Sequence, residues 1–286
     1  MPLIFVPTPL GNLRDITLRS IDVLREAALV VAEDSRVARR LLSALGICGK
    51  AIWTYHEHNA GSTTEQIIER AKNGQVAVVT DAGTPGISDP GSGLVRAARE
   101  ASLSVEMLPG PCGLVCAAVL SGFDLRRFAF EGFPPRSAGA RRRVFQTASQ
   151  SGITTIWYES PQRIAGTLMD LASVAPLTRV FLLREFTKMH EQQLLGVPAQ
   201  VLQGLSTPVR GEIMFVIEAQ SVAPLEGRGE VESNIDVLLD AHQPVSAIAK
   251  QLAEQGFGER RALYSLVMQR KKRWEEAQLK RETPPR

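Results

Sequence analysis

The segment Asp81–Gly91, which reads DAGTPGISDPG, has the composition of a ligand-binding loop. It follows the short apolar run Val76–Thr80, which predicts a buried strand. Glycine permits positive φ and close approach of backbone to a ligand, and proline fixes φ, so the loop is pre-shaped with its N–H groups available. In open α/β sheets, ligands bind beyond the carboxyl ends of the strands. For one such loop alone, a plain strand-to-helix connection is an equally open interpretation.

Two further loops of small residues follow other predicted strands. Pro109–Gly113 follows the run Ser104–Leu108, and Pro7–Asn12 follows the first strand. Three such loops at successive strand ends favour a binding cleft. Only Gly11 stands where a dinucleotide site needs Gly-x-Gly-x-x-Gly, and a Walker A loop ending in Gly-Lys-Ser/Thr is absent from the sequence. The ligand is therefore expected to be neither a Rossmann-held dinucleotide nor a P-loop triphosphate.

Histidine and cysteine do not predict a metal centre. His56 and His58 would share one face of a strand, but zinc needs a third and usually a fourth ligand, and Glu57 and Asn59 fall on the opposite face. A role for the histidines in holding a substrate, or plain surface exposure, is the stronger interpretation. The three cysteines form no framework spacing, which suits a reducing cytosol, so we expect a cytoplasmic protein without metal.

The composition is that of a globular protein outside the membrane. The chain has 286 residues, which favours about two domains, with 44% hydrophobic and 22% charged residues. Its longest apolar stretch, Cys112–Leu120, is far shorter than the roughly 20 residues of a membrane helix. The N-terminus enters a strand directly, so we expect no signal peptide and no membrane association.

Strand-like runs alternate with amphipathic stretches through the first 220 residues, which predicts an α/β fold. A glycine turn at Gly122–Leu125 divides the pattern into an N-terminal α/β domain, 1–122, and a second α/β domain, 123–222. A linker rich in Pro, Gly and charge is expected over Gln220–Glu230. The segment 231–286 is predicted to be helical, with two short helices joined at Gly256–Gly258 in the manner of a helix-turn-helix.

Positive charge is concentrated in this helical segment. The net charge of the chain is +3, but His242–Arg286 holds ten Lys and Arg against five Asp and Glu, a local charge of +5. The remainder of the chain therefore carries −2. A local basic segment is what a polyanionic partner would recognise.

Eight motifs occur in an order that resembles a known family. They are VPTPLGNLRDIT (6–17), VAEDSR (31–36), HEHN (56–59), DAGTPGISDPG (81–91), LPGP (108–111), EGFPPR (131–136), YESPQR (158–163) and REFTK (184–188). Together they closely resemble the bacterial 16S rRNA cytidine 2′-O-methyltransferases of the tetrapyrrole methylase superfamily. The resemblance implies the two-domain class III methyltransferase fold with a C-terminal helical domain, S-adenosylmethionine bound between the halves, and a homodimer. It also implies methylation of a cytidine ribose in the decoding region of the small ribosomal subunit.

The same resemblance assigns the cofactor contacts, and a further set of polar residues are candidates for contact with the substrate. Backbone groups of small residues are expected to hold the adenine and methionine parts, and the sulfonium supplies its own positive charge, so no metal is required. The cofactor residues are Ala82, Gly83, Thr84, Ile87, Cys112, Gly113, Tyr158, Glu159, Phe186 and Thr187. The substrate-binding residues are Asn12, Arg36, His58, Arg136, Arg141 and Arg142.

Three charged residues at strand ends are candidates for the chemical step, namely Asp34, Glu185 and Lys188. A ribose 2′-hydroxyl is a poor nucleophile while protonated, so a positioned base would add about 10²–10⁴-fold. A desolvated Lys188 near other cations could act as that base, whereas beside Glu185 it would stay charged and position the ribose or phosphate. For Asp34 with Arg36, a surface ion pair is the competing interpretation.

The arginines after the EGFPPR motif, and the overall function, leave alternatives open. Arg136 and Arg141–Arg143 form either a solvated helix start or a phosphate clamp at the rim of the cleft. A methylase acting on a tetrapyrrole would share the cofactor loops but would have no use for the basic tail. A non-enzymatic RNA-binding protein would use the tail and leave the three loops unexplained.

Overall fold

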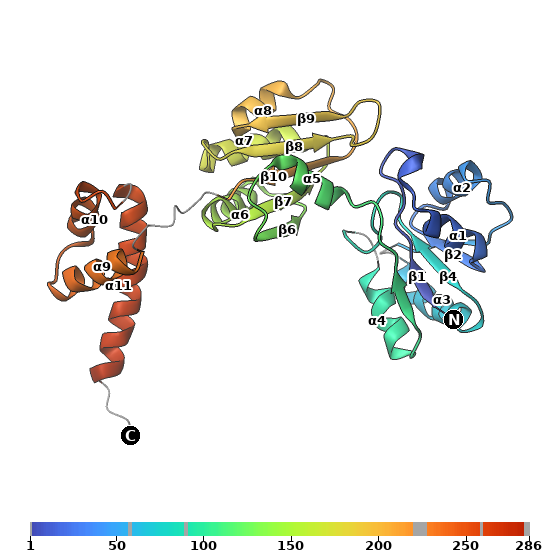
Figure 1. Ribbon diagram of the computed structural model, residues 1–286, viewed down its shortest axis with the longest axis horizontal. Coiled ribbons are helices and arrows are strands. Elements are labelled where there is room, and N and C mark those ends of the chain that lie inside the picture. Colours follow the sequence, from blue (N-terminus) through green and yellow to red (C-terminus); the bar gives the residue numbers. More distant parts are fainter. Residues whose placement is uncertain (1, 57–58, 89–90, 220–227, 258–259, 283–286) are drawn as a thin grey trace. The chain divides into compact units, whose positions relative to one another are not determined.

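The computed structural model describes residues 2–56, 59–88, 91–219, 228–257 and 260–282 (Figure 1). By their residue contacts they form two units, Met1–Gln220 and Ser221–Arg286. The hydrophobic cores of the two units are formed by separate sets of residues.

The first sheet of the larger unit is parallel throughout. Its strand order is β3-β2-β4-β1-β5, so that β4, β1 and β5 are neighbours. Strands β2 and β4 are buried on both faces, which explains their unbroken apolar sequences LVVA and VAVV. The strands are β1 (Leu3–Phe5), β2 (Leu29–Ala32), β3 (Ile52–Thr54), β4 (Val76–Val79) and β5 (Val105–Met107).

Helices cover both faces of this sheet (Figure 1). On one face α1 and α2 bury Leu24 and Leu42 against the sheet, and on the other α3 and α4 bury Ile67 and Leu94. Thr17 caps the start of α1 through a hydrogen bond from the Ser20 N–H. The four helices are α1 (Leu18–Glu26), α2 (Ser35–Ala44), α3 (Ala60–Asn73) and α4 (Ser92–Glu100).

The second sheet is mixed and has the order β6-β7-β10-β8-β9. Strand β6 runs parallel to β7, and the other pairs are antiparallel. Helices α6, α7 and α8 share one core with it, in which Phe145, Trp157 and Phe215 make aromatic contacts. The elements are β6 (Phe128–Gly132), α6 (Ala138–Gln150), β7 (Thr154–Glu159), α7 (Ile164–Val174), β8 (Val180–Arg184), β9 (Gln192–Gly196), α8 (Pro198–Gly204) and β10 (Ile213–Ile217).

Helix α5 (Gly113–Ser121) follows the first sheet in the chain but packs on the second. Its Leu114 and Ala117 share a core with Phe181 on β8 and Val216 on β10. The predicted boundary at residue 122 assigns this helix to the first half, whereas its packing favours a division in the loop before it. The glycine turn misled the sequence interpretation because Gly122, in the left-handed conformation (φ 67°), ends a helix and does not separate two cores.

The smaller unit is helical and has one core. Val231, Ile235, Ile248, Leu263 and Val267 are buried in it. Its helices are α9 (Arg228–Asp240), α10 (Val245–Glu254) and α11 (Arg260–Glu282). Helix α9 begins within the predicted linker, and residues 220–227 of that linker lie outside the described residues.

The fold class predicted from the sequence is confirmed: two α/β halves precede a set of C-terminal helices. The sequence interpretation did not identify β3 and β9. Both are edge strands with partly exposed residues, so neither shows the continuous apolar run of a buried strand.

Candidate active site

The three small-residue loops lie at the carboxyl ends of neighbouring parallel strands and are bonded to one another. Thr8 and Gly83 exchange two backbone hydrogen bonds, Thr8 N to Gly83 O at 2.9 Å and Gly83 N to Thr8 O at 3.0 Å. The Thr84 hydroxyl donates to the carbonyl of Pro111 at 2.9 Å. Gly83 has φ 79°, which side chains rarely adopt, so glycine is required for this loop shape. The loops are therefore held as one rigid surface.

This surface forms part of a cavity of about 220 Å³. The other walls come from the second sheet, at the ends of β6 and β7 and the start of β10. Eight of the ten predicted cofactor residues line it: Ala82, Gly83, Thr84, Ile87, Cys112, Gly113, Tyr158 and Glu159. Residues far apart in the chain are thus brought together, and their role as cofactor contacts stays a prediction.

Six lining residues were not identified from the sequence, namely Leu10, Ser88, Phe133, Glu212, Ile213 and Met214. Leu10, Ser88 and Phe133 stand inside motifs already singled out, so the motifs could have pointed to them. Glu212, Ile213 and Met214 lie at the start of β10, where the sequence shows only a buried strand. They reach the cavity because β10 pairs antiparallel with β7 and β8.

Phe186 and Thr187 do not line this cavity. Glu185 and Thr187 adopt positive φ (49° and 63°), and the resulting turn brings the segment against the loop after β1. The backbone N–H of Asn12 donates to the Thr187 hydroxyl at 3.1 Å. Thus the structure places Phe186 and Thr187 at a contact between the two halves, beside Gly11.

Gly11 makes this contact possible. A Cβ atom at Gly11 would lie 2.3 Å from Lys188 Cγ, 2.8 Å from Thr187 Oγ1 and 3.1 Å from the carbonyl oxygen of Phe186. Carbon atoms in contact are normally about 3.5–4.0 Å apart. Only glycine therefore allows the first half to approach the 186–188 segment this closely.

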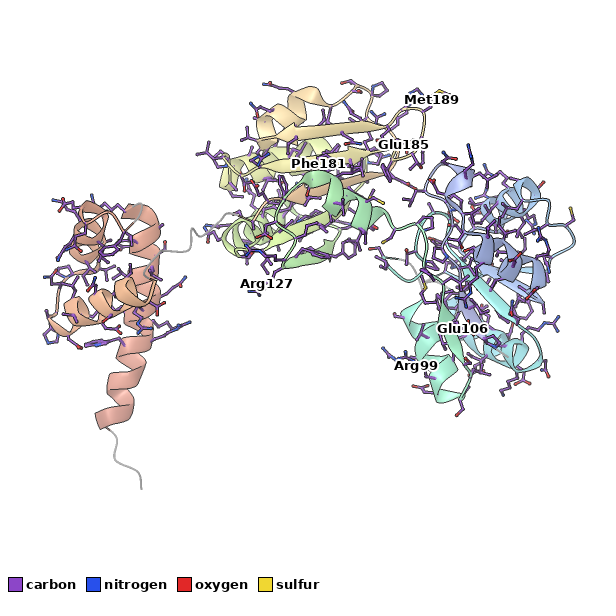
Figure 2. The ribbon with its side chains drawn as sticks, viewed as in Figure 1. Arg99, Glu106, Arg127, Phe181, Glu185 and Met189 are labelled. Atoms are coloured by element: carbon purple, nitrogen blue, oxygen red, sulfur yellow. The ribbon has the colours of Figure 1, made fainter. Side chains whose placement is uncertain are left out.

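Lys188 is held between two carboxylates. Its Nζ lies 2.9 Å from Glu185 Oε1 and 3.3 Å from Glu212 Oε2, and its side chain is 29% exposed. Glu185 Oε1 also accepts the backbone N–H of Glu212 at 3.0 Å. Gly211 leaves room for this carboxylate, because a Cβ there would lie 2.1 Å from Glu185 Cδ. Figure 2 shows Glu185 and Met189 at the turn that follows β8.

The carboxylates determine the charge of Lys188. Burial alone would lower the pKa of Lys188, but the hydrogen bonds and negative charges of Glu185 and Glu212 outweigh it and raise that pKa above its ordinary value. For Glu185, burial alone would raise the pKa, but the bonds from Lys188 and from the Glu212 N–H lower it below its ordinary value. Lys188 and Glu185 are therefore both ionised at neutral pH.

Asp34 makes its contacts elsewhere. Its carboxylate caps α2 by accepting the Arg36 N–H at 2.7 Å and pairs with the Arg36 guanidinium at 2.6 Å. These bonds hold the pKa of Asp34 well below its usual range. Such a carboxylate is a weak base, and the Arg36 side chain of the pair is 80% exposed. The geometry matches a surface ion pair and disfavours Asp34 as the catalytic base.

Arg141 does not present a free guanidinium to a phosphate, which corrects that part of the predicted clamp. It is largely buried and pairs with Asp170, and its Nη1 donates to the carbonyls of Pro135 and Arg136 at 3.3 and 3.1 Å. Burial and these bonds give Arg141 a structural role, in which it holds the 135–136 backbone against Asp170. Its partner lies 29 residues away, so no local pattern in the sequence indicated the pair.

The remaining predicted substrate residues are at or near the surface. Arg136 is exposed, and Arg142 is half-exposed with a long contact of 3.9 Å to Asp170. The side chain of Asn12 caps a short helical turn by accepting the Arg14 N–H at 3.0 Å. His58 lies outside the described residues. Their roles in binding substrate stay predictions.

Glu159 and Arg163 form a second structural ion pair beside the cavity. The buried Glu159 carboxylate accepts the Ser160 N–H at 2.8 Å and the Thr167 hydroxyl at 2.6 Å, and it pairs with Arg163 at 3.3 Å. The same guanidinium donates to the carbonyl of Pro134 at 2.7 Å. The wall of the cavity and the loop after β6 are thereby joined.

In the described part of the chain, no group of three or more His, Cys, Asp or Glu side chains is placed to hold a metal ion. No helix in the described ranges is both long enough and apolar enough to span a bilayer.

Comparison with known proteins first defines the class. Residues 2–201 match the family described as Tetrapyrrole (Corrin/Porphyrin) Methylases. The solved structure of diphthine synthase has the same fold, with a TM-score of 0.61 over 76% of this chain and 90% of that one. At 16% identity, this likeness concerns the fold alone.

Full-length relatives then define the group. A protein named ribosomal RNA small subunit methyltransferase I from Neisseria meningitidis serogroup B is 38% identical over 268 residues, covering 92% of this chain and 91% of the relative. Proteins of the same name from Xylella fastidiosa and Escherichia coli O157:H7 are 40% and 35% identical, covering 91% and 93% of this chain and 96% and 94% of theirs. The chain therefore belongs to the tetrapyrrole methylase family, in the group of these methyltransferases.

Proposed function

We propose that this protein transfers the methyl group of S-adenosylmethionine to the 2′-hydroxyl of a cytidine in the decoding region of 16S rRNA. The observation that carries the proposal is the cavity in which eight predicted cofactor residues from both halves converge. The names of the relatives support the class of RNA. The choice of cytidine ribose and of the decoding region rests on the motif resemblance.

The cavity suits S-adenosylmethionine. No Lys or Arg is among the described residues that line it. Its two acidic side chains, Glu159 and Glu212, are paired with Arg163 and Lys188, two cations that do not themselves line the cavity. Loops of small residues would hold the adenine and methionine parts by their backbone groups. When bound, S-adenosylmethionine supplies an electrophilic methyl group on a positively charged sulfur.

The protein is expected to act mainly by positioning. Correct orientation of two reacting groups can lower the activation barrier by roughly 7–11 kcal/mol. Hydrogen bonds across the two halves, such as that from Asn12 to Thr187, fix the walls relative to each other. Lys188 is held charged by Glu185 and Glu212, so we assign it to anchoring the ribose or its phosphate and not to accepting the proton. The oxygen–methyl bond forms as the sulfur–methyl bond breaks, and the hydroxyl proton passes to solvent water. Glu185 holds Lys188 in place.

The helical unit is proposed to anchor the RNA. On α11, Tyr264, Met268 and Lys272 recur every four residues and are exposed, so they form one ridge. The neutralised Arg270 lies on the other side of this helix, paired with Asp236 at 2.6 Å. An exposed aromatic side chain on the same surface as a lysine is typical of proteins that bind unpaired RNA.

A homodimer in the cytoplasm completes the proposal. Helix α5 exposes Val115, Val119 and Leu120 on the side away from its core. An apolar surface on a helix whose other side is already buried supports contact with a second copy of the chain.

Transfer of labelled methyl from S-adenosylmethionine tests the function. Purified protein is incubated with small ribosomal subunits, with free 16S rRNA and with a porphyrinoid. We expect label in the rRNA only, at one cytidine of the decoding region, in a 2′-O-methyl nucleotide that leaves the neighbouring bond resistant to alkali. Label in the porphyrinoid would support the tetrapyrrole alternative. Binding of RNA without any transfer would support a non-enzymatic role.

A further inference from the structure

Phe133 stands at the cavity with an unusual degree of exposure. It follows β6, where the pairing with β7 shifts register between Phe130 and Gly132, and Gly132 has φ 69°. A bulge of this kind redirects the chain next to a site. Phe133 thereby lines the cavity, while 54% of its surface remains exposed. Its ring lies 5.8 Å from that of Tyr158, another lining residue.

The loop that carries Phe133 is held rigid by two arginine side chains. Arg163 donates to the carbonyls of Pro134 and Pro135 at 2.7 and 3.2 Å. Arg141 donates to the carbonyls of Pro135 and Arg136. The carbonyls of residues 134–136 thus all accept hydrogen bonds from guanidinium groups. Both guanidinium groups are themselves paired with acidic side chains. An exposed aromatic ring on so well-supported a loop is preorganised for contact with a ligand.

We infer that Phe133 is a stacking platform for an unpaired base of the RNA substrate at the rim of the cavity, an inference that rests on the proposed function. Proteins recognise unpaired RNA by stacking its bases on aromatic side chains and by neutralising its phosphates. The exposed Arg136, three residues further along the same loop, supplies the positive charge. A methyl acceptor on ribose must be held beside the cavity, and a base stacked on Phe133 would hold its nucleotide there.

The chain offers a matched control in Phe128. It lies at the other end of β6, is 47% exposed and is not among the lining residues of the cavity. Phe133→Leu removes the ring but keeps an apolar side chain at an exposed position, and Phe133→Trp keeps a stacking surface. Phe128→Leu makes the same chemical change away from the site.

The experiment measures kcat and KM for small ribosomal subunits with the full-length protein, together with the affinity for S-adenosylhomocysteine by calorimetry. Phe133→Leu is expected to reduce kcat/KM roughly 5- to 150-fold, the range for loss of one base-stacking contact. Its affinity for S-adenosylhomocysteine should remain within about twofold, because the lost stacking contact is with an RNA base and not with the cofactor. Phe133→Trp should retain more of the wild-type kcat/KM than Phe133→Leu does, because its ring still offers a stacking surface. Phe128→Leu should keep wild-type kcat/KM within about threefold, because Phe128 does not line the cavity.

Three outcomes would overturn the inference while leaving the proposed function intact. One is an unchanged kcat/KM for Phe133→Leu. Another is a loss of S-adenosylhomocysteine affinity that accounts for the whole effect, which would make Phe133 a cover for the cofactor. The third is an equal loss for Phe128→Leu. A wild-type protein that methylates no small-subunit RNA would instead refute the proposed function, and this inference with it.

Discussion

Gly11→Ala tests whether the close approach of the two halves positions the reacting groups. The added Cβ would lie 2.3 Å from Lys188 Cγ, over 1 Å inside a normal contact. The Phe186 carbonyl, 3.1 Å from the same position, is backbone and cannot swing away as a side-chain tip would. Either the 186–188 turn or the loop after β1 must therefore move by about an ångström to restore normal carbon–carbon contact distances.

A displacement of this size has separable effects on rate and on stability. A 1 Å misplacement of positioning groups can reduce catalysis by about 100-fold. Overpacking costs roughly 1–3 kcal/mol, and the lower value applies here because Gly11 is exposed. For a chain of this size 1 kcal/mol lowers Tm by about 2–4 °C. We therefore expect a folded protein with a slow chemical step.

The assay is single-turnover methyl transfer with saturating S-adenosylmethionine and small subunits, alongside thermal unfolding. The control is Gly166→Ala in α7, where a Cβ would meet nothing within 4 Å. In a Lys188→Ala background, Gly11→Ala should cost much less, since the tightest of its three contacts is gone. A Gly11→Ala rate within threefold of wild type in a folded protein would refute the reasoning, as would equal losses with and without Lys188.

Three further predictions address the anchor, the cofactor loop and the tail. Lys188→Ala should slow single-turnover methyl transfer at least about 100-fold, and Lys188→Arg should not restore the rate. Because the pKa of Lys188 is raised, the wild-type rate should show no rise from Lys188 deprotonation between about pH 6 and 9. A rise in the wild-type rate across that range that is lost in Lys188→Ala would identify Lys188 as the base. Gly83→Val should abolish most of the affinity for S-adenosylhomocysteine in calorimetry, because φ 79° excludes a branched side chain; unchanged affinity would remove this loop from the cofactor site. If Lys272 and Arg273 both contact phosphate, the double variant Lys272→Ala/Arg273→Ala should have a slope of log affinity for rRNA against log salt that is shallower by about 1.4–1.8. Lys250→Ala is the control. A slope equal to that of the wild type would show that neither side chain contacts phosphate.

The Glu185–Lys188 pair also makes a stability prediction of definite sign. The Glu185 pKa is lowered in the folded state, so its contribution is present above the unfolded value of about 4.3 and is lost as pH falls through the folded pKa. The Lys188 pKa is raised, so its contribution is present below about 10.4 and is lost as pH rises through the folded pKa. Relative to Lys188→Ala, the wild-type advantage in chemical unfolding should therefore be constant between about pH 5 and 10.

The sequence predicted the cavity well because its signals are local. Each small-residue loop directly follows a buried run, and carboxyl ends of parallel strands necessarily meet at one sheet edge. Ala82 and Cys112 could therefore be placed together without knowledge of any long-range contact. Tyr158, on β7 of the second sheet, was assigned only by the family resemblance. The same reasoning did not place α5 on the second sheet. A helix that is apolar on all sides gives no indication of which sheet it packs against.

Arginine roles were the weakest part of the sequence interpretation. Arg136 and Arg141 belong to one basic run, yet one is exposed and the other is largely buried in a structural role. The difference depends on Asp170, which α7 brings to α6 by helix packing that no local pattern reveals. Arg163 was quoted only as the last residue of the YESPQR motif and was given no role, although its i, i+4 spacing from Glu159 fits an ion pair.

Two short-range ion pairs show why the candidate catalytic residues could be proposed from the sequence but not ranked. Asp34 with Arg36 and Glu185 with Lys188 are both closely spaced in the chain, and spacing alone does not distinguish a surface pair from a site. Lys188 differs because Glu212 reaches it from a distant strand. The cluster also depends on Gly11 and Gly211, where any side chain would overlap Lys188 or Glu185. The charged site is therefore made by the fold, and two glycines with no chemistry of their own determine whether it forms.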